Sequence, residues 1–304
     1  MLLENVLKEY LYDCQLRKLS KRTIQSLRQN NNRLFVYLGN TYAIFELKDV
    51  RRVHVQSFIN YLSELGRKET YVNSILKSIR GLFHYCEEEE YIKESPVRKV
   101  KFQKEEITAI RTFNDDEVKR MVAYYSGKHF LDMRNRLIIT TLLDSGIRNS
   151  ELCDIKMTDL CDNAIRIYGK GKKIRYVPLT PSINKILIRY LRVRENYIKD
   201  KNKYHIEYLL LSQKGKKLTP EAIENIVRKC GKECSIREEI RCSPHTCRHY
   251  YAQAQLKNGC DLFTVSRLLG HNNINITKRY LNSIETDDIL EIAQKTSPLR
   301  NIGA

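Results

Sequence analysis

Residues 243–250 read SPHTCRHY and contain a strong helix start. Ser243 is a good N-cap because its side-chain oxygen can accept a hydrogen bond from the first turn, and Pro244 suits the first helical position. His245 and Arg248 then lie three residues apart on one face. A histidine and an arginine at a helix N-terminus can hold a phosphate with a titratable group and a bidentate clamp. A capped helix with exposed polar residues would explain this motif equally well.

A second motif lies downstream, where residues 268–281 read LLGHNNINITKRYL. Gly270 is expected to end one helix, and His271 follows it directly. Tyr280 comes nine residues after His271, on a short helix begun by Asn273 or Asn275. A tyrosine in such a place usually serves packing. A phenol surrounded by cations, however, can attack phosphorus.

A third motif lies upstream, where residues 144–152 read DSGIRNSEL. Gly146 is expected to break an apolar helix and Asn149 to cap the next one. Arg148 would then stand at a helix start, where N–H groups without intrahelical partners favour an anion. The alternative is an ordinary ion pair between Arg148 and Glu151.

Between these motifs the pattern predicts a β-hairpin. Two β-prone runs, residues 164–168 and 174–179, flank the glycine-rich turn GKGKK at residues 169–173. Lys170 would project from the turn, where it could reach a DNA groove and deliver a proton; the alternative is a solvated loop. A further apolar run, residues 208–211, is a candidate third strand.

The N-terminal third predicts a helical bundle, because apolar residues recur there at three- and four-residue spacing. The expected helices are residues 3–16, a helix from the N-cap Ser20 to Gly39, residues 53–65 and residues 71–86. We therefore predict a mainly α-helical protein with a small β-sheet. It consists of a helical domain at 1–98, a basic linker at 99–112 and an α+β domain at 113–284. The α+β domain is expected to begin with a helix capped by Asp115 or Asp116.

Residues 285–304 form a C-terminal tail. Asp287 or Asp288 is expected to cap a helix with an apolar stripe that includes Ile289 and Leu290. This stripe should be buried, either on its own domain or on another protomer.

The chain has 304 residues, and its 42% hydrophobic content suffices for about two domains. Its 54 Lys and Arg against 36 Asp and Glu give a formal charge of +18, which favours a polyanionic partner, although a basic balance can also serve solubility. No apolar run reaches the roughly 18 residues of a membrane helix, and the first residues do not resemble a signal peptide. These features predict a cytoplasmic protein without membrane contact.

The nine cysteines predict reduced thiols, because no secretion signal accompanies them. Cys230, Cys234, Cys242 and Cys247 form one cluster in the sequence, with His245 between the last two. Their irregular spacing makes a zinc site the weaker interpretation and half-buried packing the stronger one.

Six residues together resemble, in order and spacing, the active site of the tyrosine recombinases, or phage-integrase family: Arg148 in GIRNSEL, Lys170 in GKGKK before RYVPL, His245 and Arg248 in HTCRH, His271 in LLGH, and Tyr280. Residues 1–98, with Ser20, Thr23 and GLFHYCEEEEYIKESPV, are similar to the core-binding, SAM-like domain of Xer-like recombinases and integrases. Asp144-Ser145 before Gly146 departs mildly from the family pattern and touches none of the six.

The resemblance implies that Tyr280 attacks a scissile phosphate, forms a 3′-phosphotyrosyl bond and frees a 5′-hydroxyl. Arg148 and Arg248 would bind the non-bridging oxygens and stabilise the transition state. Lys170 would protonate the leaving oxygen. The bond energy stays in the ester, so no cofactor, metal or ATP is expected, which agrees with a sequence that contains no GxxxxGK[ST] loop.

The two histidines complete the implied site. His245 would help to take the tyrosine proton, and His271 would donate a further hydrogen bond to the phosphate.

The implied partner is double-stranded DNA with specific recombination sites. Four protomers on two duplexes would exchange strands through a Holliday junction. A second recombinase or a directionality factor could take part as an accessory protein. The tail at 285–304 would be exchanged between protomers. The favoured biological role is integration or excision of a mobile genetic element in a bacterial nucleoid. The alternatives are a Xer-type resolvase of chromosome or plasmid dimers, a type IB topoisomerase, and a DNA-binding protein with an inactive site.

Overall fold

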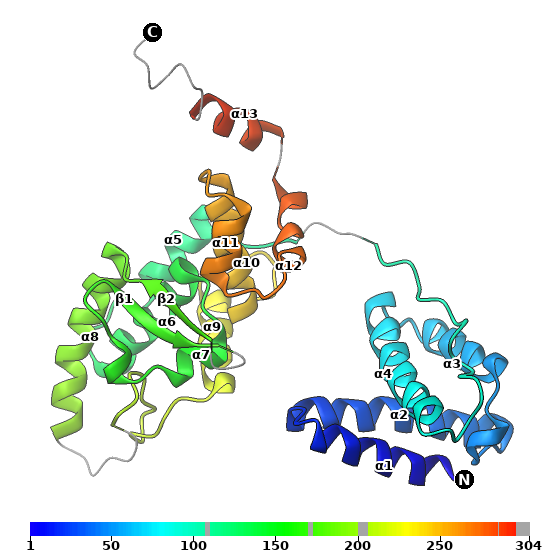
Figure 1. Ribbon diagram of the computed structural model, residues 1–304. Coiled ribbons are helices and arrows are strands. Elements are labelled where there is room, and N and C mark those ends of the chain that lie inside the picture. The colour runs from blue at the N-terminus through cyan, green and yellow to red at the C-terminus, as the bar shows by residue number, and fades with distance from the viewer. Residues whose placement is uncertain (107–109, 170–172, 200–205, 285, 296–304) are drawn as a thin grey trace. The chain divides into compact units, whose positions relative to one another are not determined.

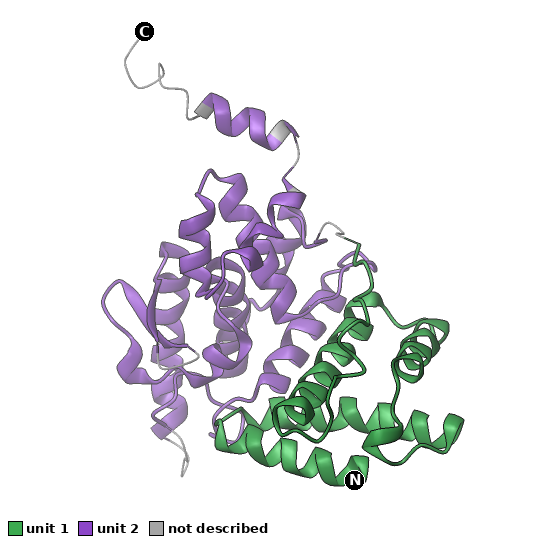
Figure 2. Cartoon of the chain, turned by 45° about the vertical axis from the view of Figure 1, so that its right-hand side comes forward, with its two compact units in different colours: residues 1–107 green, residues 108–304 purple. Residues whose placement is uncertain are grey.

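The computed structural model describes residues 1–106, 110–169, 173–199, 206–284 and 286–295. The chain divides into two compact units, residues 1–107 and 108–304, and each unit has a hydrophobic core of its own (Figure 2). The division between the units falls inside the stretch 99–112. The predicted fold class, mainly helical with a small sheet, is confirmed.

The first unit is built from helices packed around one core. They are α1 (Leu3–Leu16), α2 (Lys21–Tyr42), the 3-10 turn η1 (Leu47–Asp49), α3 (Arg52–Glu64) and α4 (Glu69–Glu88). Ser20 caps α2 as predicted, since its hydroxyl accepts the Thr23 N–H at 3.1 Å. The predicted end at Gly39 is wrong, because α2 continues to Tyr42. The Phe45 ring lies 3.0 Å from where a Gly39 Cβ would stand, so this glycine serves close packing rather than a helix stop.

The second unit holds the other elements that the structure describes (Figure 1). In chain order they are α5 (Asp115–Tyr124), α6 (Phe130–Ser145), α7 (Asn149–Asp154), η2 (Met157–Asp159), β1 (Ala164–Tyr168), β2 (Ile174–Pro178), α8 (Pro181–Lys199), α9 (Pro220–Glu233), α10 (Pro244–Lys257), α11 (Leu262–Leu269), α12 (Asn275–Lys278), η4 (Leu281–Ser283) and α13 (Thr286–Lys295). Among the described residues, none of these helices or those of the first unit is long and apolar enough to span a membrane.

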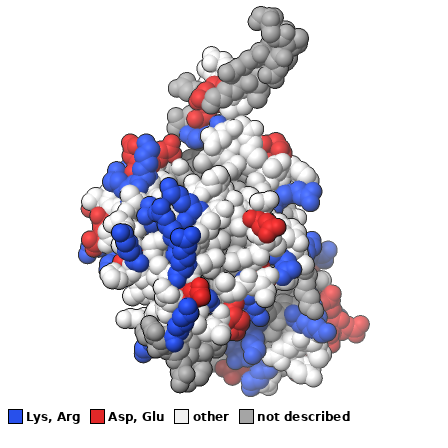
Figure 3. All heavy atoms as spheres, turned by 90° about the vertical axis from the view of Figure 1, so that its left-hand side faces the viewer, with Lys and Arg blue, Asp and Glu red and all other residues white. Residues whose placement is uncertain are grey.

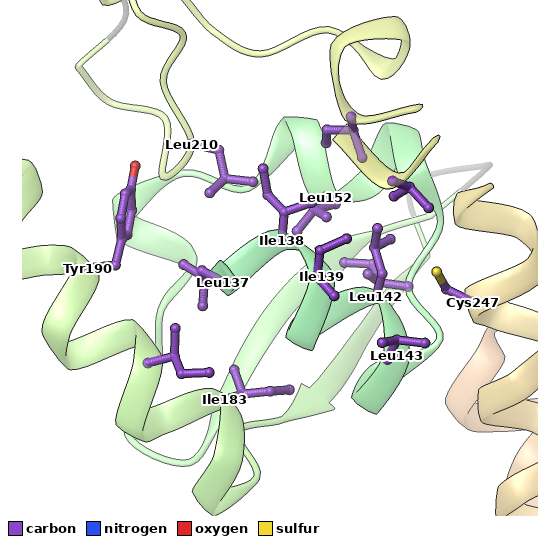
Figure 4. Close-up of a cluster of buried hydrophobic side chains, with 14 of the residues drawn as sticks. Leu137, Ile138, Ile139, Leu142, Leu143, Leu152, Ile183, Tyr190, Leu210 and Cys247 are labelled. Carbon is purple, nitrogen blue, oxygen red and sulfur yellow. The ribbon is translucent and has the colours of Figure 1, made fainter. Parts of the chain in front are cut away.

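Helix α6 is the centre of the larger core. Residues 137–143 of this helix are all buried, so this part of α6 is enclosed on every side. Figure 4 shows Leu137 and Leu142 of α6 among side chains from other elements, including Ile183 and Tyr190 of α8. The helix that ends at Gly146 is therefore anchored on several sides.

The hairpin forms as predicted, with β1 and β2 antiparallel and Ile165 paired with Val177. Lys170, at its turn, lies outside the described residues. The expected third strand at 208–211 is wrong, because this segment makes only isolated bridges, from Tyr208 to Lys156 and from Leu211 to Lys217. Its backbone pairs with the segment after α7 instead, where Leu209 N–H donates to the Ile155 carbonyl at 2.8 Å.

Several helix starts differ from the sequence expectation by one or two residues. Asn114, not Asp115 or Asp116, caps α5 and accepts the Glu117 N–H at 2.8 Å. Arg148, not Asn149, is the N-cap residue of α7. These changes arise because the glutamate three residues into each helix bonds back to the N-cap backbone N–H, which selects the start.

The C-terminal elements also differ in detail from the prediction. Tyr280 follows α12 rather than lying on it, and α13 begins at Thr286, before the two aspartates proposed as its cap. Ile289 and Leu290 of α13 are each 56% exposed, so the part of the chain that the structure describes does not bury this pair.

Candidate active site

A tight turn places Arg148. Gly146 ends α6 with a left-handed φ of +59°, and a Cβ at this position would lie 2.5 Å from a ring carbon of Tyr251. Only glycine allows α10 to approach so closely. The Arg148 guanidinium then donates to Glu151 Oε1 at 2.8 Å and to the Gly270 carbonyl at 2.9 Å.

Arg248 reaches the same place from α10. It is buried, and it donates to the Gly146 carbonyl at 2.6 Å and to the Leu269 carbonyl at 2.7 Å. Burial, and then the neighbouring charge of Arg148, lower the pKa of Arg248 to about 10, so it stays charged at neutral pH. Two guanidinium groups therefore bind the adjacent carbonyls of residues 269 and 270, and their mutual repulsion favours an anion between them.

A buried carboxylate organises these cations. Glu151 accepts from Arg175 Nη1 and Nη2 at 2.8 and 2.7 Å as well as from Arg148. Burial alone raises the pKa of Glu151, but the hydrogen bonds and charges of Arg175 and Arg148 outweigh it and lower the pKa to about 2. Arg175 also donates to the Leu268 carbonyl at 3.1 Å, so it joins β2 to the end of α11.

The two predicted histidines lie within the influence of these arginines. Burial, then Arg248 and Arg148, lower the pKa of His271 to about 4, and its Nδ1 is hydrogen-bonded to the buried Thr277 hydroxyl at 2.8 Å. Burial, then Arg248 and Arg279, also lower the pKa of His245 below its ordinary value. His271 is therefore neutral at pH 7, and His245 is favoured in its neutral form.

Tyr280 is buried in a small cluster that includes Tyr251, Leu256 and Leu269. Its phenol oxygen lies 2.9 Å from Nδ1 of His249. Burial raises the pKa of Tyr280, although Arg248 and Arg279 oppose the effect. The phenol is therefore protonated at neutral pH and hydrogen-bonded to a neighbouring imidazole.

Five of the six predicted site residues thus gather in one region: Arg148, His245, Arg248, His271 and Tyr280. Lys170 is outside the described residues. Sequence reasoning missed His249 and Arg175, and it considered Glu151 only as an alternative partner of Arg148. His249 could have been found, because it lies four residues after His245 on the same helical face.

The four clustered cysteines pack in the interior of the second unit. Cys230, Cys234 and Cys247 are buried and Cys242 is half-buried, with burial raising the pKa of all four thiols. The Cys242 sulfur would lie 2.2 Å from a Cβ at Gly231, so this side chain packs closely against that glycine. Within the described ranges, no three His, Cys, Asp or Glu side chains are grouped so that they could hold a metal ion.

Among the charged side chains on one face of the molecule, the basic ones cover the larger area. On the face in Figure 3, Lys and Arg (blue) cover more of the surface than Asp and Glu (red) and form a continuous group near its centre. Such a surface attracts a polyanion.

The comparisons with known proteins agree with this geometry. The model of the Phage integrase family matches residues 111–286, more than half of the chain, and that of the Phage integrase SAM-like domain matches residues 2–104. The chain therefore belongs to the phage integrase family. It is a tyrosine recombinase, an enzyme that cleaves and rejoins DNA.

Relatives and solved structures resemble nearly the whole chain. XerC of Thermodesulfovibrio yellowstonii, a tyrosine recombinase, is 28% identical over 284 residues, which cover 92% of this chain and 91% of the relative. The XerH site-specific recombinase, in a post-cleavage complex with its palindromic difH substrate, has a TM-score of 0.74 at 22% identity and covers 98% of this chain and 84% of its own. A lambda integrase tetramer bound to a Holliday junction has a TM-score of 0.70 at 17% identity, with 90% and 78% covered.

Proposed function

We propose that this recombinase cleaves DNA with Tyr280 as nucleophile and with Arg148 and Arg248 as the phosphate clamp. The observation that carries the proposal is the convergence of both guanidinium groups on the adjacent carbonyls of Leu269 and Gly270. A phosphodiester can replace backbone oxygens as the acceptor there and gain charge-assisted hydrogen bonds. The clamp would be strongest in the transition state, where negative charge on the phosphoryl oxygens increases.

Three further residues take supporting roles in this proposal. Lys170 would protonate the leaving 5′-oxygen. His271 would donate a hydrogen bond to the phosphate, with its ring held by Thr277. His245 would assist removal of the tyrosine proton. The reaction would need no cofactor, because the bond energy is kept in the phosphotyrosyl ester.

The segments of the chain would have different roles. Residues 1–98 would grip DNA as a core-binding domain, residues 99–112 would link it to the catalytic domain at 113–284, and the tail at 285–304 would reach a neighbouring protomer. We propose specific duplex sites as substrate and a homotetramer as the active assembly, working in the cytoplasm at the nucleoid. A tetrameric assembly on a Holliday junction is what the solved lambda integrase structure contains.

For the biological role, we propose integration and excision of a mobile genetic element. A Xer-type role in resolving dimers is the second candidate, and the XerC alignment over 92% of this chain favours it specifically. The two roles predict different substrates: the ends of an element flanking the gene in the first case, and directly repeated sites on a plasmid dimer in the second. Recombination of both in parallel reporter plasmids would separate them.

The chemical proposal is tested by trapping the covalent complex. A duplex that the protein itself selects from random DNA is nicked next to the cleavage point, so that the freed fragment diffuses away and the adduct accumulates. Wild-type protein should form an adduct that survives denaturation, whereas Tyr280→Phe should bind the duplex normally and form none. An adduct in Tyr280→Phe would show that another residue is the nucleophile.

A further inference from the structure

We propose that His249, which lies outside the predicted set of six, is the group that takes the proton from Tyr280 during strand cleavage. The inference rests on the proposed role of Tyr280 as nucleophile and adds the identity of its base. A base must lie within hydrogen-bond reach of the proton that it removes, and geometry is the first criterion for such a residue.

The contact is direct. His249 Nδ1 lies 2.9 Å from Tyr280 Oη, with the two ring centroids 5.5 Å apart. His245, the residue expected to assist deprotonation, has its ring centre 4.4 Å from that of His249 in an edge-on arrangement. The two imidazole rings are therefore in direct contact.

The helix start that positions the arginine clamp also positions this base. Ser243 caps α10 by accepting the Thr246 N–H at 3.2 Å, which sets where the helix begins. Arg248 and His249 are consecutive on this helix, so one rigid element presents a phosphate ligand and a base. On the other side, the buried cluster around Tyr280 holds the phenol against the imidazole.

Burial and the neighbouring positive charges keep His249 unprotonated before DNA binds. Burial, followed by His245, Arg279 and Arg248, lowers the pKa of His249 to about 4, so the ring is neutral at pH 7. With its hydrogen on Nε2, the neutral ring offers the Nδ1 lone pair to the phenol. When a phosphodiester binds at Arg248, its negative charge offsets the nearby cations and makes His249 a stronger base. Proton removal is thereby more favourable with DNA in place.

The proposed step balances in atoms and charge. The Tyr280 O–H bond breaks and its proton passes to His249 Nδ1, while the phenol oxygen forms a bond to phosphorus. The bond from phosphorus to the 5′-oxygen breaks, and that oxygen takes a proton from Lys170. Rejoining reverses each transfer, so His249 returns the proton to Tyr280.

The test uses His249→Asn in the full-length protein. Asparagine can hold a hydrogen bond near the position of Nδ1 but cannot accept the proton. We expect single-turnover cleavage of the nicked duplex to fall about 100-fold, the lower end for general acid–base catalysis, with DNA binding unchanged. The matched control is Tyr250→Phe on the same helix, whose hydroxyl bonds Asp115 instead, and it should cleave normally.

A chemical rescue distinguishes a base from a structural residue. Replacing Tyr280 by 3,5-difluorotyrosine, whose phenol is more acidic, should restore at least tenfold of the loss in His249→Asn and change little in the wild type. The inference would be overturned if His249→Asn cleaved at the wild-type rate. It would also be overturned if the fluorinated phenol did not restore the lost activity.

A second measurement does not depend on folding of the His249 variant. The ¹⁵N signal of His249 Nδ1 should shift in Tyr280→Phe, and an unchanged signal would also overturn the inference. The same Tyr280→Phe protein reports separately on the proposed function, because a covalent adduct in it would remove Tyr280 as nucleophile whatever His249 does.

Discussion

The Glu151 carboxylate accepts two hydrogen bonds from Arg175, which lies 24 residues later in the sequence. Arg175 Nη1 donates to Oε1 at 2.8 Å and Nη2 donates to Oε2 at 2.7 Å. Both side chains are largely buried, with exposures of 7% and 13%. This pair fixes the carboxylate that in turn holds Arg148, so it connects the hairpin to the phosphate clamp.

Arg175→Ala should therefore destabilise the protein by about 3 kcal/mol, because it leaves a buried carboxylate with one partner fewer. Cleavage should fall as well, since Arg148 loses part of its support. Urea denaturation measures the first effect. The control is Lys119→Ala, which breaks an ion pair with Asp116 whose two side chains are 77% and 78% exposed, and it should cost at most about 0.5 kcal/mol. Equal costs for the two variants would contradict the role of the buried pair.

The stability of the protein should depend on acid through Glu151. Its pKa in the folded protein is about 2, below the ordinary 4.5, so its contribution is complete above pH 4.5 and is lost as the pH falls towards 2. The unfolding free energy of wild type relative to Glu151→Gln should shrink by about 3 kcal/mol over this range. Urea titrations at several pH values measure it, and a constant difference would refute the assignment.

Removing either clamp arginine should slow cleavage strongly. Arg148→Ala and Arg248→Ala should each cost about 3 kcal/mol of transition-state stabilisation, the scale of a lost oxyanion donor. Arg248→Ala should also lower thermal stability, because the Gly146 and Leu269 carbonyls lose their donor. Single-turnover cleavage and thermal unfolding measure the two effects. Arg241→Ala is the control, since its side chain is 85% exposed, and either clamp variant cleaving like this control would show that the phosphate binds elsewhere.

Truncation after Ser283 tests the tail. Ile289 and Leu290 are exposed in the single chain, so we expect the shortened protein to bind one site normally but to lose cooperative assembly, with recombination reduced more than cleavage. Gel-shift titrations and strand-exchange assays measure these steps. Lys257→Ala is a milder companion variant, because it removes only the ion pair to Asp288 at 2.9 Å within the chain. Normal synapsis by the truncated protein would exclude the role in assembly, and failure to fold would favour packing on its own domain.

The sequence by itself determined the features that depend on neighbours along the chain. Ser243 and Pro244 begin α10 as predicted, and Gly146 and Gly270 end helices in left-handed conformations. Caps, stops and apolar periodicity act over a few residues, so they can be read without the fold.

Only the tertiary structure decided which distant groups meet. Gly39 lies inside α2 and leaves room for the Phe45 ring, and the backbone of residues 208–211 pairs with the segment after α7 instead of joining the hairpin. The contact of His249 with Tyr280 likewise joins residues 31 positions apart. Such partners are selected by the burial of the surrounding core and by the need to satisfy buried polar groups, and these constraints exist only once the helices have packed.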